Sequence, residues 1–434
     1  MLPTDSALDL AARLRRRELS SVELVRHCLG EIRRANPDLG AFVDVSEPRA
    51  LREARRADER LARGDRAPFL GVPTGIKDHE HVRGYFTRMG SRAFRWLYAP
   101  VDGFTARACR RAGFVLLGKL ATSELTILPI IDDPPARNPH DRERYAGGSS
   151  GGSGAAVAAN MIPIAPGSDG GGSIRIPASF CGLVGWKTSR GALPNPYGVL
   201  DPAGISVSGP LARTARDAAA LGDVLAGGTG RFADACDDRV PPLRVRVLTQ
   251  SPLVDVDPEV AAATTAVARR LEAAGHTVDE APPVDGSIDE FIPIMARLVG
   301  QIPLVFGMAR RMQSSTLWLH GVGRTVSRQA CIAAGERLAQ RVLAWFGDAD
   351  VAVTPTVGTL PPRVGAYAGL GGEATFRAAA QLGAFTAPFN VSGQPAISIP
   401  AARSRAGLPI GVQLVGRHGA DRLLLALAES LIAS

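Results

Sequence analysis

The chain has 434 residues, of which 45% are hydrophobic, so it can bury a large core. Its formal net charge of +8 does not by itself indicate a nucleic-acid partner, because the arginines are dispersed or alternate with acids, as in Arg52–Arg60. No run of about 20 apolar residues predicts a membrane span. The N-terminus has neither the basic nor the apolar region of a signal peptide. We therefore expect a cytoplasmic protein with no nucleic-acid and no membrane partner.

The cysteines and lysines are informative for opposite reasons. The cysteines are odd in number and lack CxxC spacing, which argues against a disulfide framework or a zinc site: Cys28, Cys109, Cys181, Cys236 and Cys331. Only three of the fifty basic residues are lysine, namely Lys77, Lys119 and Lys187. Lysine can lose its proton when it is buried, whereas arginine cannot. A lysine in this arginine-rich chain therefore marks a position where arginine would not serve, and Lys77 is the candidate base.

The predicted elements begin with helices. An apolar stripe at helical spacing covers 8–14, and Ser20 and Glu23 are spaced as a capping box ahead of a second stripe over 22–32. From residue 73 onward, short apolar runs alternate with helical patterns, which is typical of an α/β sandwich with a mainly buried sheet. The runs are 114–117, 162–164, 244–248, 351–353, 396–399 and 410–415. Helices are predicted over 258–274 and at the end, over 421–432.

Two glycine-rich segments carry the clearest chemistry. The first is Gly-Gly-Ser-Ser-Gly-Gly-Ser over 147–153, and the second is Gly-Ser-Asp-Gly-Gly-Gly-Ser-Ile-Arg-Ile-Pro over 167–177. Glycine allows the backbone to approach a reacting group and to turn its N–H groups toward it, as oxyanion stabilisation requires. A flexible linker is excluded because a helix-like alanine run and an apolar run follow the first segment directly. No histidine lies in either segment, so a serine-lysine arrangement fits better than a serine-histidine one.

The pair of segments resembles the amidase signature, and further motifs stand in the order of that family. They are 71–78, 181–188, 207–210, 351–356, 385–400 and 408–416. The resemblance implies the amidase-signature α/β fold, with a large mixed and mostly buried sheet between layers of helices. It also implies one domain over 1–434, in which the turn-rich segment 227–242 is a loop. Within it we expect flanking helices over 1–66, a catalytic core over 67–215 and a variable, substrate-facing segment over 284–345.

The resemblance also implies catalytic roles. Ser173 would be the nucleophile, Ser149 would pass on its proton, and Lys77 would accept it, giving hydrolysis of a linear carboxamide through an acyl-enzyme. The peptide bond before Ser149 would be cis. For this relay the pKa of Lys77 must fall by roughly 3 units from about 10.4, which costs about 4 kcal/mol and which burial can supply.

The remaining site residues follow from the same motifs. The oxyanion would be met by backbone N–H groups of Gly170, Gly171, Gly172 and Ser173. Asp169 and Arg175 would brace this loop as an ion pair. Ser123, Glu124 and Ser150 are candidate substrate contacts, and the apolar segment 291–299, continued by Met312 and Trp318, is a candidate acyl-side wall. No cofactor and no metal are expected, because His79-Glu80-His81 lacks the further ligands that a metal needs.

Three alternatives stay open. The glutaminase subunit of an aspartyl/glutamyl-tRNA amidotransferase has the same signature, but its tyrosine-containing glycine-serine stretch is missing between 300 and 350. An α/β-hydrolase-type esterase could use Gly-Gly-Ser-Ser-Gly over 147–151 with His418, although a polar segment precedes this motif instead of a buried strand. A catalytically inactive binding protein is the third. For an amidase the expected partner is a small-molecule amide, and a homodimer is left open.

Overall fold

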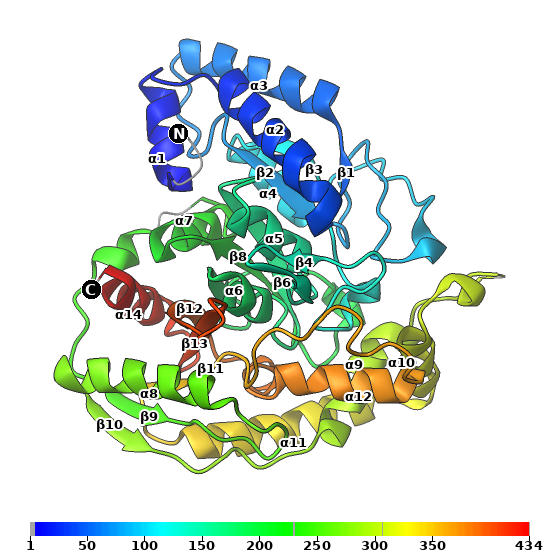
Figure 1. Ribbon diagram of the computed structural model, residues 1–434, viewed down its shortest axis with the longest axis vertical. Coiled ribbons are helices and arrows are strands. Elements are labelled where there is room, and N and C mark those ends of the chain that lie inside the picture. The colour runs from blue at the N-terminus through cyan, green and yellow to red at the C-terminus, as the bar shows by residue number, and fades with distance from the viewer. Residues whose placement is uncertain (1–4, 229–230, 306, 434) are drawn as a thin grey trace.

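An eight-stranded sheet, a three-stranded sheet and surrounding helices build the protein (Figure 1), and the computed structural model describes them over residues 5–228, 231–305 and 307–433. Residues 1–4, 229–230 and 306 fall in the predicted segments 1–66, 227–242 and 284–345 and lie outside the described residues, as does residue 434. The predicted α/β fold with a large mixed sheet is confirmed.

The large sheet runs in the order β10-β9-β11-β13-β12-β7-β8-β6. Its strands are β6 (Ile164–Asp169), β7 (Val184–Lys187), β8 (Val207–Ala212), β9 (Arg244–Val247), β10 (Thr277–Glu280), β11 (Val351–Pro355), β12 (Ala396–Arg403) and β13 (Pro409–Gly416). Strand β9 is parallel to β10 and to β11, and the remaining pairs are antiparallel. The edge strand β6 ends in the second glycine-rich segment.

The small sheet was not distinguished from the large one in the sequence. It contains β1 (Phe42–Val45), β2 (Pro73–Lys77) and β3 (Val115–Leu120) in the order β1-β3-β2. A hydrogen bond of 2.8 Å from Thr74 Oγ1 to Ile164 O joins β2 to β6 of the large sheet. This contact brings the end of β2, where Lys77 lies, to the end of β6. A separate ribbon consists of β4 (Arg137–Asn138) and β5 (Asp141–Tyr145).

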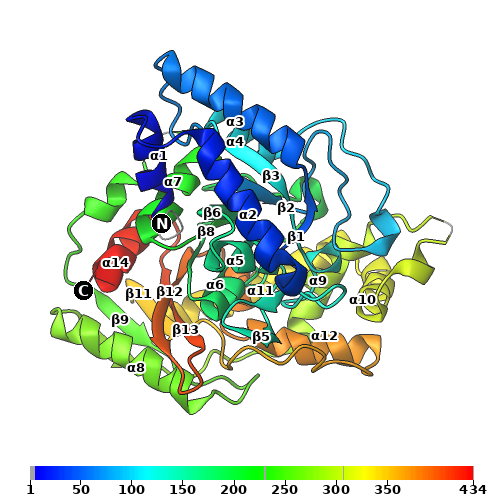
Figure 2. The same ribbon diagram turned by 45° about the horizontal axis from the view of Figure 1, so that its top comes forward.

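Helices cover both faces of the large sheet. The α-helices are α1 (Ala7–Arg15), α2 (Ser21–Leu39), α3 (Glu47–Ala62), α4 (Phe104–Arg111), α5 (Gly151–Ala158), α6 (Arg175–Cys181), α7 (Ala215–Leu225), α8 (Pro258–Ala273), α9 (Ile288–Gly300), α10 (Ser314–Thr325), α11 (Arg328–Phe346), α12 (Gly372–Ala380), α13 (Ala387–Val391) and α14 (Asp421–Ala433). The 3-10 turns are η1 (Arg92–Phe94), η2 (Glu124–Thr126), η3 (Gly198–Leu200), η4 (Asp234–Asp237), η5 (Ala309–Arg311) and η6 (Gln381–Gly383). Figure 2 shows α2 and α3 over the small sheet, α1 beside α7 and α8 beside β9.

Side-chain alternation along β7 shows that helices form one layer on each face of the large sheet. A Cβ on Gly185 would meet Ala178 of α6, whereas the neighbouring Trp186 packs on Gly222 of α7. Because successive strand residues point to opposite faces, α6 and α7 lie on opposite sides of the sheet. The central strands are therefore buried on both faces, which is why their sequences read as continuous apolar runs rather than alternating ones.

The predicted helical signals in the flanking regions are confirmed. Ser20 Oγ accepts from Glu23 N at 3.2 Å and the Glu23 carboxylate accepts from Ser20 N at 2.9 Å, which is the capping box at the start of α2. In α3 the alanines before the last turn are buried and Arg52, Arg55 and Arg56 are exposed to solvent, as predicted for a solvated helix face. The final helix, α14, spans almost the range predicted for it.

Candidate active site

The two glycine-rich segments lie next to each other. Ser149 precedes α5 and Ser173 precedes α6, and these two helices pack together. Ser150 N donates to Ser173 O at 3.2 Å, and Ser150 Oγ donates to Ser168 O at 3.2 Å. The backbones of both segments are thus tied together at the end of β6.

The peptide bond between Gly148 and Ser149 is cis, as the resemblance implied. Gly148 is sterically required here, because a Cβ at this position would lie 2.6 Å from Ile130 N and 2.7 Å from Pro129 C. Such distances to backbone atoms leave no room for a side chain.

Lys77 contacts this segment from the end of β2. Its Nζ donates to Ser149 Oγ at 2.7 Å, to Ser168 Oγ at 3.0 Å and to Ser168 O at 3.4 Å. The side chain is 1% exposed, and this burial lowers the pKa of Lys77 to about 7, although Asp169 opposes the shift. A substantial fraction of Lys77 is therefore neutral near pH 7 and can accept a proton.

All three lysines are buried, at 1% exposure or less. Lys119 pairs with Asp78 at 2.8 Å, and Lys187 donates to Thr188 O at 2.9 Å. Lys119 and Lys187 are therefore interior residues as well, although the sequence singled out Lys77 alone. Among the three lysines, Lys77 is the one whose amine meets a serine hydroxyl of the glycine-rich segments.

A buried ion pair shapes the loop between β6 and α6. Arg175 Nη2 and Nε each lie 2.9 Å from Asp169, and Asn390 Nδ2 also donates to this carboxylate at 2.9 Å. Burial alone would raise the pKa of Asp169, but Arg175, Asn390 and Lys187 outweigh it and hold the pKa well below its usual range. Neither Asp169 nor Arg175 is among the residues that line the adjacent cavity.

The Asp169 carboxylate accepts a hydrogen bond from one of the four N–H groups expected at the oxyanion site. Gly172 N donates to Asp169 Oδ1 at 2.6 Å, so this donor is directed inward. The N–H groups of Gly170, Gly171 and Ser173 donate to no protein acceptor in the described parts of the chain. Three of the four expected donors are therefore available to a ligand. The conformation of Gly172 also depends on glycine, because its φ is +125° and a Cβ there would lie only 2.2 Å from Thr386 Oγ1.

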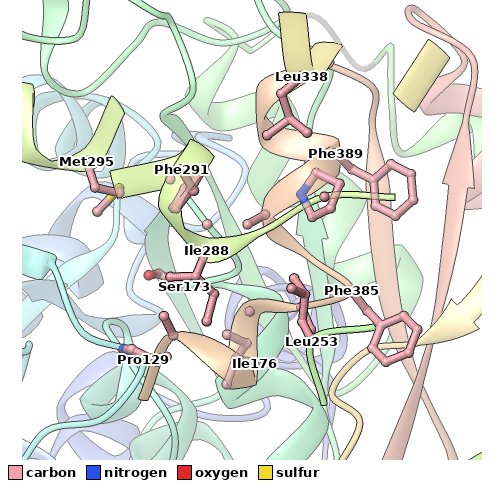
Figure 3. Close-up of a pocket in the computed structure, with 18 of the residues that line it drawn as sticks. Pro129, Ser173, Ile176, Leu253, Ile288, Phe291, Met295, Leu338, Phe385 and Phe389 are labelled. Carbon is pink, nitrogen blue, oxygen red and sulfur yellow. The ribbon is translucent and has the colours of Figure 1, made fainter. Parts of the chain in front are cut away.

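Ser149, Ser168 and Ser173 open into a mainly apolar cavity. Figure 3 shows Ser173 surrounded by side chains from α9, α13 and the loops before them. The apolar lining includes Ile127, Leu128, Pro129, Ile176, Leu253, Ile288, Phe291, Met295, Leu298, Leu338, Phe376, Phe385 and Phe389. Lys77 is hydrogen-bonded to Ser149, which is the first contact of the predicted relay. The second contact, between Ser149 Oγ and Ser173 Oγ, is not formed within the described residues.

Part of the predicted acyl-side wall lines this cavity. Phe291, Met295 and Leu298 of α9 do so. Met312 does not, and Trp318 lies behind the lining, where its ring packs against Phe376 at 5.5 Å between centroids.

The candidate substrate contacts Ser123, Glu124 and Ser150 are not among the lining residues. Ser123 Oγ donates to Leu128 O at 2.9 Å, while Glu124 accepts from Ser91 Oγ at 2.5 Å and from Gln313 N at 2.8 Å. These side chains are directed into the protein because their hydrogen bonds shape the loop. The residues that follow them, 126–129, line the cavity instead.

Sequence reasoning missed Ser168 and Tyr197. Both line the cavity, and Ser168 lies within hydrogen-bond distance of Lys77. Ser168 could have been found, because it is the hydroxyl residue in the Gly-Ser-Asp start of the second segment. Tyr197 carries no local signal, since it reaches the site through a loop between β7 and β8.

The esterase alternative finds no support in the geometry. His418 is exposed and its Nε2 lies 3.0 Å from Arg190 O, and it does not line the cavity that contains Ser149. The Gly-x-Ser-x-Gly motif follows the partly exposed strand β5 of the two-stranded ribbon rather than a strand of the large sheet.

None of the helices within the described residues has both the length and the apolar character needed to cross a membrane.

Known proteins resemble this chain over almost its whole length. The family model described as Amidase matches residues 23–301 and 307–425. The protein named "Putative amidase AmiA2" of Mycobacterium tuberculosis is 36% identical over 100% of this chain and 93% of its own length.

Two solved structures are similar in the same way. A 6-aminohexanoate cyclic dimer hydrolase complexed with substrate has a TM-score of 0.89 and 32% identity, over 100% of this chain and 97% of that one. A glutamyl-tRNA(Gln) amidotransferase subunit of Thermotoga maritima has a TM-score of 0.74 and 26% identity, over 98% and 94% of the two chains.

Proposed function

Because this chain belongs to the amidase signature family, hydrolases that act on amides, we propose that it cleaves a carboxamide through an acyl-Ser173 intermediate. The observation that carries the proposal is the 2.7 Å contact between Lys77 Nζ and Ser149 Oγ at the base of the cavity that Ser173 also lines. A buried amine with a pKa of about 7 beside a serine hydroxyl is suited to act as a base.

The proton path follows from these positions. Ser173 Oγ attacks the carbonyl carbon and gives its proton to Ser149, whose own proton passes to neutral Lys77. The C–N bond then breaks, and the leaving amine receives the proton from Lys77 through Ser149. Water attacks the acyl-Ser173 ester by the same relay, which releases the carboxylate and restores the serine.

The oxyanion would be held by the N–H groups of Gly170, Gly171 and Ser173. They flank the nucleophile, and they lack protein acceptors in the described residues. Each donor of this kind typically contributes about 2.7–4 kcal/mol to transition-state stabilisation.

The lining of the cavity supports an apolar acyl group as substrate. Phe291, Phe385 and Phe389 supply aromatic surface, and among the described lining residues the one with a formal charge at neutral pH is Asp285. Neither arginine, lysine nor histidine lines the described cavity. A free carboxylate on the substrate would have no cationic partner there, so we propose a neutral alkyl or aryl amide.

The same charge pattern weighs against the glutaminase alternative. Glutamine carries a carboxylate and an ammonium group next to each other, and both require charged or strongly polar partners when they are buried. The described cavity offers no cation for the carboxylate. We therefore favour a free-standing amidase over a component of an amidotransferase.

The test is covalent labelling with a fluorophosphonate, followed by peptide mass mapping. We expect an adduct on Ser173 that is lost in Lys77→Arg, because arginine keeps its proton. Ser251→Ala is the matched control, since Ser251 lines the same cavity without contacting Lys77. An adduct on Ser149 or Ser150, or labelling that persists in Lys77→Arg, would overturn the mechanism.

Substrate class is tested in parallel with hexanoyl p-nitroanilide, the cyclic dimer of 6-aminohexanoate and glutamine. Turnover of either apolar amide supports the proposed class, and the comparison separates linear from cyclic substrates. Turnover of glutamine alone would sink it.

A further inference from the structure

The cavity contains hydroxyl groups that the proposed mechanism does not use. Most of them already have partners in the protein. Thr126 and Tyr197 are hydrogen-bonded to each other, Ser251 Oγ accepts from a backbone N–H at 3.1 Å, and Ser287 belongs to the capping box of α9. Ser206 differs from these residues. It lines the cavity as well, but its Oγ is buried and has no hydrogen-bond partner in the described parts of the chain.

The pairing of β6 with β8 places Ser206 beside the nucleophile loop, the segment 170–174 that joins β6 to α6. Asp169 is paired with Val207, so the next position in register sets Ser206 opposite Gly170. A Cβ on Gly170 would lie 3.2 Å from Ser206 Oγ. Because glycine has no side chain, the space between this loop and the Ser206 hydroxyl is not filled, and both residues line the cavity.

The position of Ser206 relative to this loop is fixed by hydrogen bonds. The Asp201 carboxylate accepts from Ser206 N at 2.8 Å and from Ile205 N at 3.2 Å. Asn390 Nδ2 donates to Ile205 O at 3.0 Å and to Asp169 Oδ1 at 2.9 Å. Because the same Asp169 carboxylate shapes the nucleophile loop, the Ser206 hydroxyl and that loop are held in a defined arrangement.

Ser206 and the candidate base lie on opposite sides of the edge strand β6. On one side, Thr74 and Lys77 of β2 donate to Ile164 O and Ser168 O of this strand. On the other side β6 pairs with β8, which Ser206 directly precedes. In the proposed mechanism the leaving amine receives its proton from the side of Lys77. The acyl part of the substrate therefore lies toward Ser206.

The unpaired hydroxyl of Ser206 favours a polar group of the substrate beside it. A serine hydroxyl can donate one hydrogen bond and accept two, and a buried hydroxyl that is left unpaired costs free energy. An apolar substrate group would leave the Ser206 hydroxyl unpaired, whereas a hydroxyl or carbonyl group would pair with it. A carboxylate is disfavoured, because no arginine, lysine or histidine lines the described cavity.

We propose that Ser206 is a specificity-determining residue: it hydrogen-bonds a neutral polar substituent, a hydroxyl or a carbonyl group, on the acyl chain close to the scissile amide. The inference rests on the proposed amidase function. It narrows the substrate class from a simple alkyl or aryl amide to an amide that carries such a substituent in an otherwise apolar acyl group.

The experiment measures how well hexanamide, 2-hydroxyhexanamide and 3-hydroxyhexanamide protect Ser173 from fluorophosphonate labelling, which does not depend on turnover. The readout is the concentration of each amide that halves the labelling rate. In the unmodified protein we expect one of the hydroxy amides to need an about tenfold lower concentration than hexanamide. This preference should be lost in Ser206→Ala, and the comparison of amides within one variant cancels changes in the labelling rate itself. Ser251→Ala is the matched control and should keep the preference, because the Ser251 hydroxyl already has a backbone partner.

Equal protection by the three amides in the unmodified protein, or protection by none of them, would overturn the inference. A preference that persists in Ser206→Ala would overturn it as well. If Ser206→Ala does not fold, Gly170→Ala takes its place under the same criteria, because the added methyl group would fill the space beside the Ser206 hydroxyl. Absence of Ser173 labelling in the unmodified protein would instead contradict the proposed function.

Discussion

Lys77 Nζ lies 2.7 Å from Ser149 Oγ, and both side chains are enclosed, with exposures of 1% and 0%. The two residues come from different parts of the fold, the end of β2 in the small sheet and the loop before α5. Their contact depends on the docking of the small sheet against β6, which Thr74 and Ile164 secure. The candidate base is therefore positioned by the packing of the two sheets.

The rate of amide hydrolysis should depend on the protonation of Lys77. Burial lowers its pKa to about 7, and only the neutral amine can accept the serine proton. We expect kcat/KM to fall about tenfold per pH unit below that pKa and to level off above it. A profile measured with hexanoyl p-nitroanilide from about pH 5 to 10 tests this, and a flat profile through the neutral range would contradict it.

Lys77→Met should abolish activity and stabilise the fold. The folded-state pKa of Lys77 lies below its unfolded value of about 10.4, so the unfolded chain binds the additional proton and lysine is a cost to folding. This cost is complete below about pH 7 and disappears as the pH rises toward about 10.4. We expect the free energy of unfolding to increase by about 3–4 kcal/mol at pH 7, with the gain shrinking at higher pH. Urea denaturation at several pH values measures it, and equal gains at all pH values would refute this account.

Two glycines of the nucleophile loop should tolerate replacement by alanine to very different degrees. At Gly170 a Cβ would approach Ser206 Oγ to 3.2 Å, a contact that a small shift relieves, so Gly170→Ala should change the unfolding free energy by less than about 1 kcal/mol. At Gly172 the φ of +125° and the 2.2 Å approach to Thr386 Oγ1 exclude a side chain. Gly172→Ala should destabilise by more than about 2 kcal/mol and abolish labelling of Ser173. Thermal unfolding of Gly170→Ala and Gly172→Ala measures the difference in stability. Equal stability of the two variants would contradict the loop geometry.

Asp169→Asn should destabilise the protein strongly, because it leaves the charge of Arg175 buried and unpaired. Removal of one partner of a buried pair typically costs about 3–5 kcal/mol. Since the folded-state pKa of Asp169 is lowered, the carboxylate stabilises the fold fully above about pH 4 and this contribution is lost as the pH falls further. The difference in free energy of unfolding between Asp169→Asn and the unmodified protein should therefore become smaller below about pH 4, and urea denaturation at several pH values measures it.

The control for this variant is Asp237→Asn, which breaks the exposed ion pair with Arg216. Solvent screens an exposed pair, so little change in the free energy of unfolding is expected. If Asp169→Asn and Asp237→Asn lost similar amounts of stability, the burial of the Asp169–Arg175 pair would not explain its contribution.

Phe291→Ala should change substrate preference more than chemistry. Phe291 lines the cavity, and its ring lies 3.4 Å from the position of a Cβ on Gly171 in the nucleophile loop. Loss of its apolar surface should lower kcat/KM for hexanoyl p-nitroanilide about tenfold or more, with a smaller effect on the acetyl analogue. The ratio of the two substrates is the readout, and an unchanged ratio would remove Phe291 from the acyl-binding wall.

Short-range patterns in the sequence predicted several helices and strands of this protein. The capping box of Ser20 and Glu23, the terminal helix and the strands β3, β9, β11, β12 and β13 could be read from short-range spacing, because capping and hydrophobic periodicity act over a few residues. The rarity of lysine also pointed to Lys77 as a base, since a buried lysine can lose its proton, and the structure buries Lys77.

The tertiary structure alone decided which groups meet. The sequence did not reveal that Lys77 belongs to a separate small sheet or that the Asp169 carboxylate accepts from the N–H of Gly172. It also did not reveal that Tyr197 reaches the cavity from a distant loop and contacts Thr126 Oγ1 there. Ser123 and Glu124 were expected to touch substrate, but their hydrogen bonds hold the loop that carries Thr126 into the cavity. Such contacts depend on the packing of segments far apart in the chain. No pattern within either segment encodes the distance between them, so only the folded chain brings base, relay and nucleophile to one cavity.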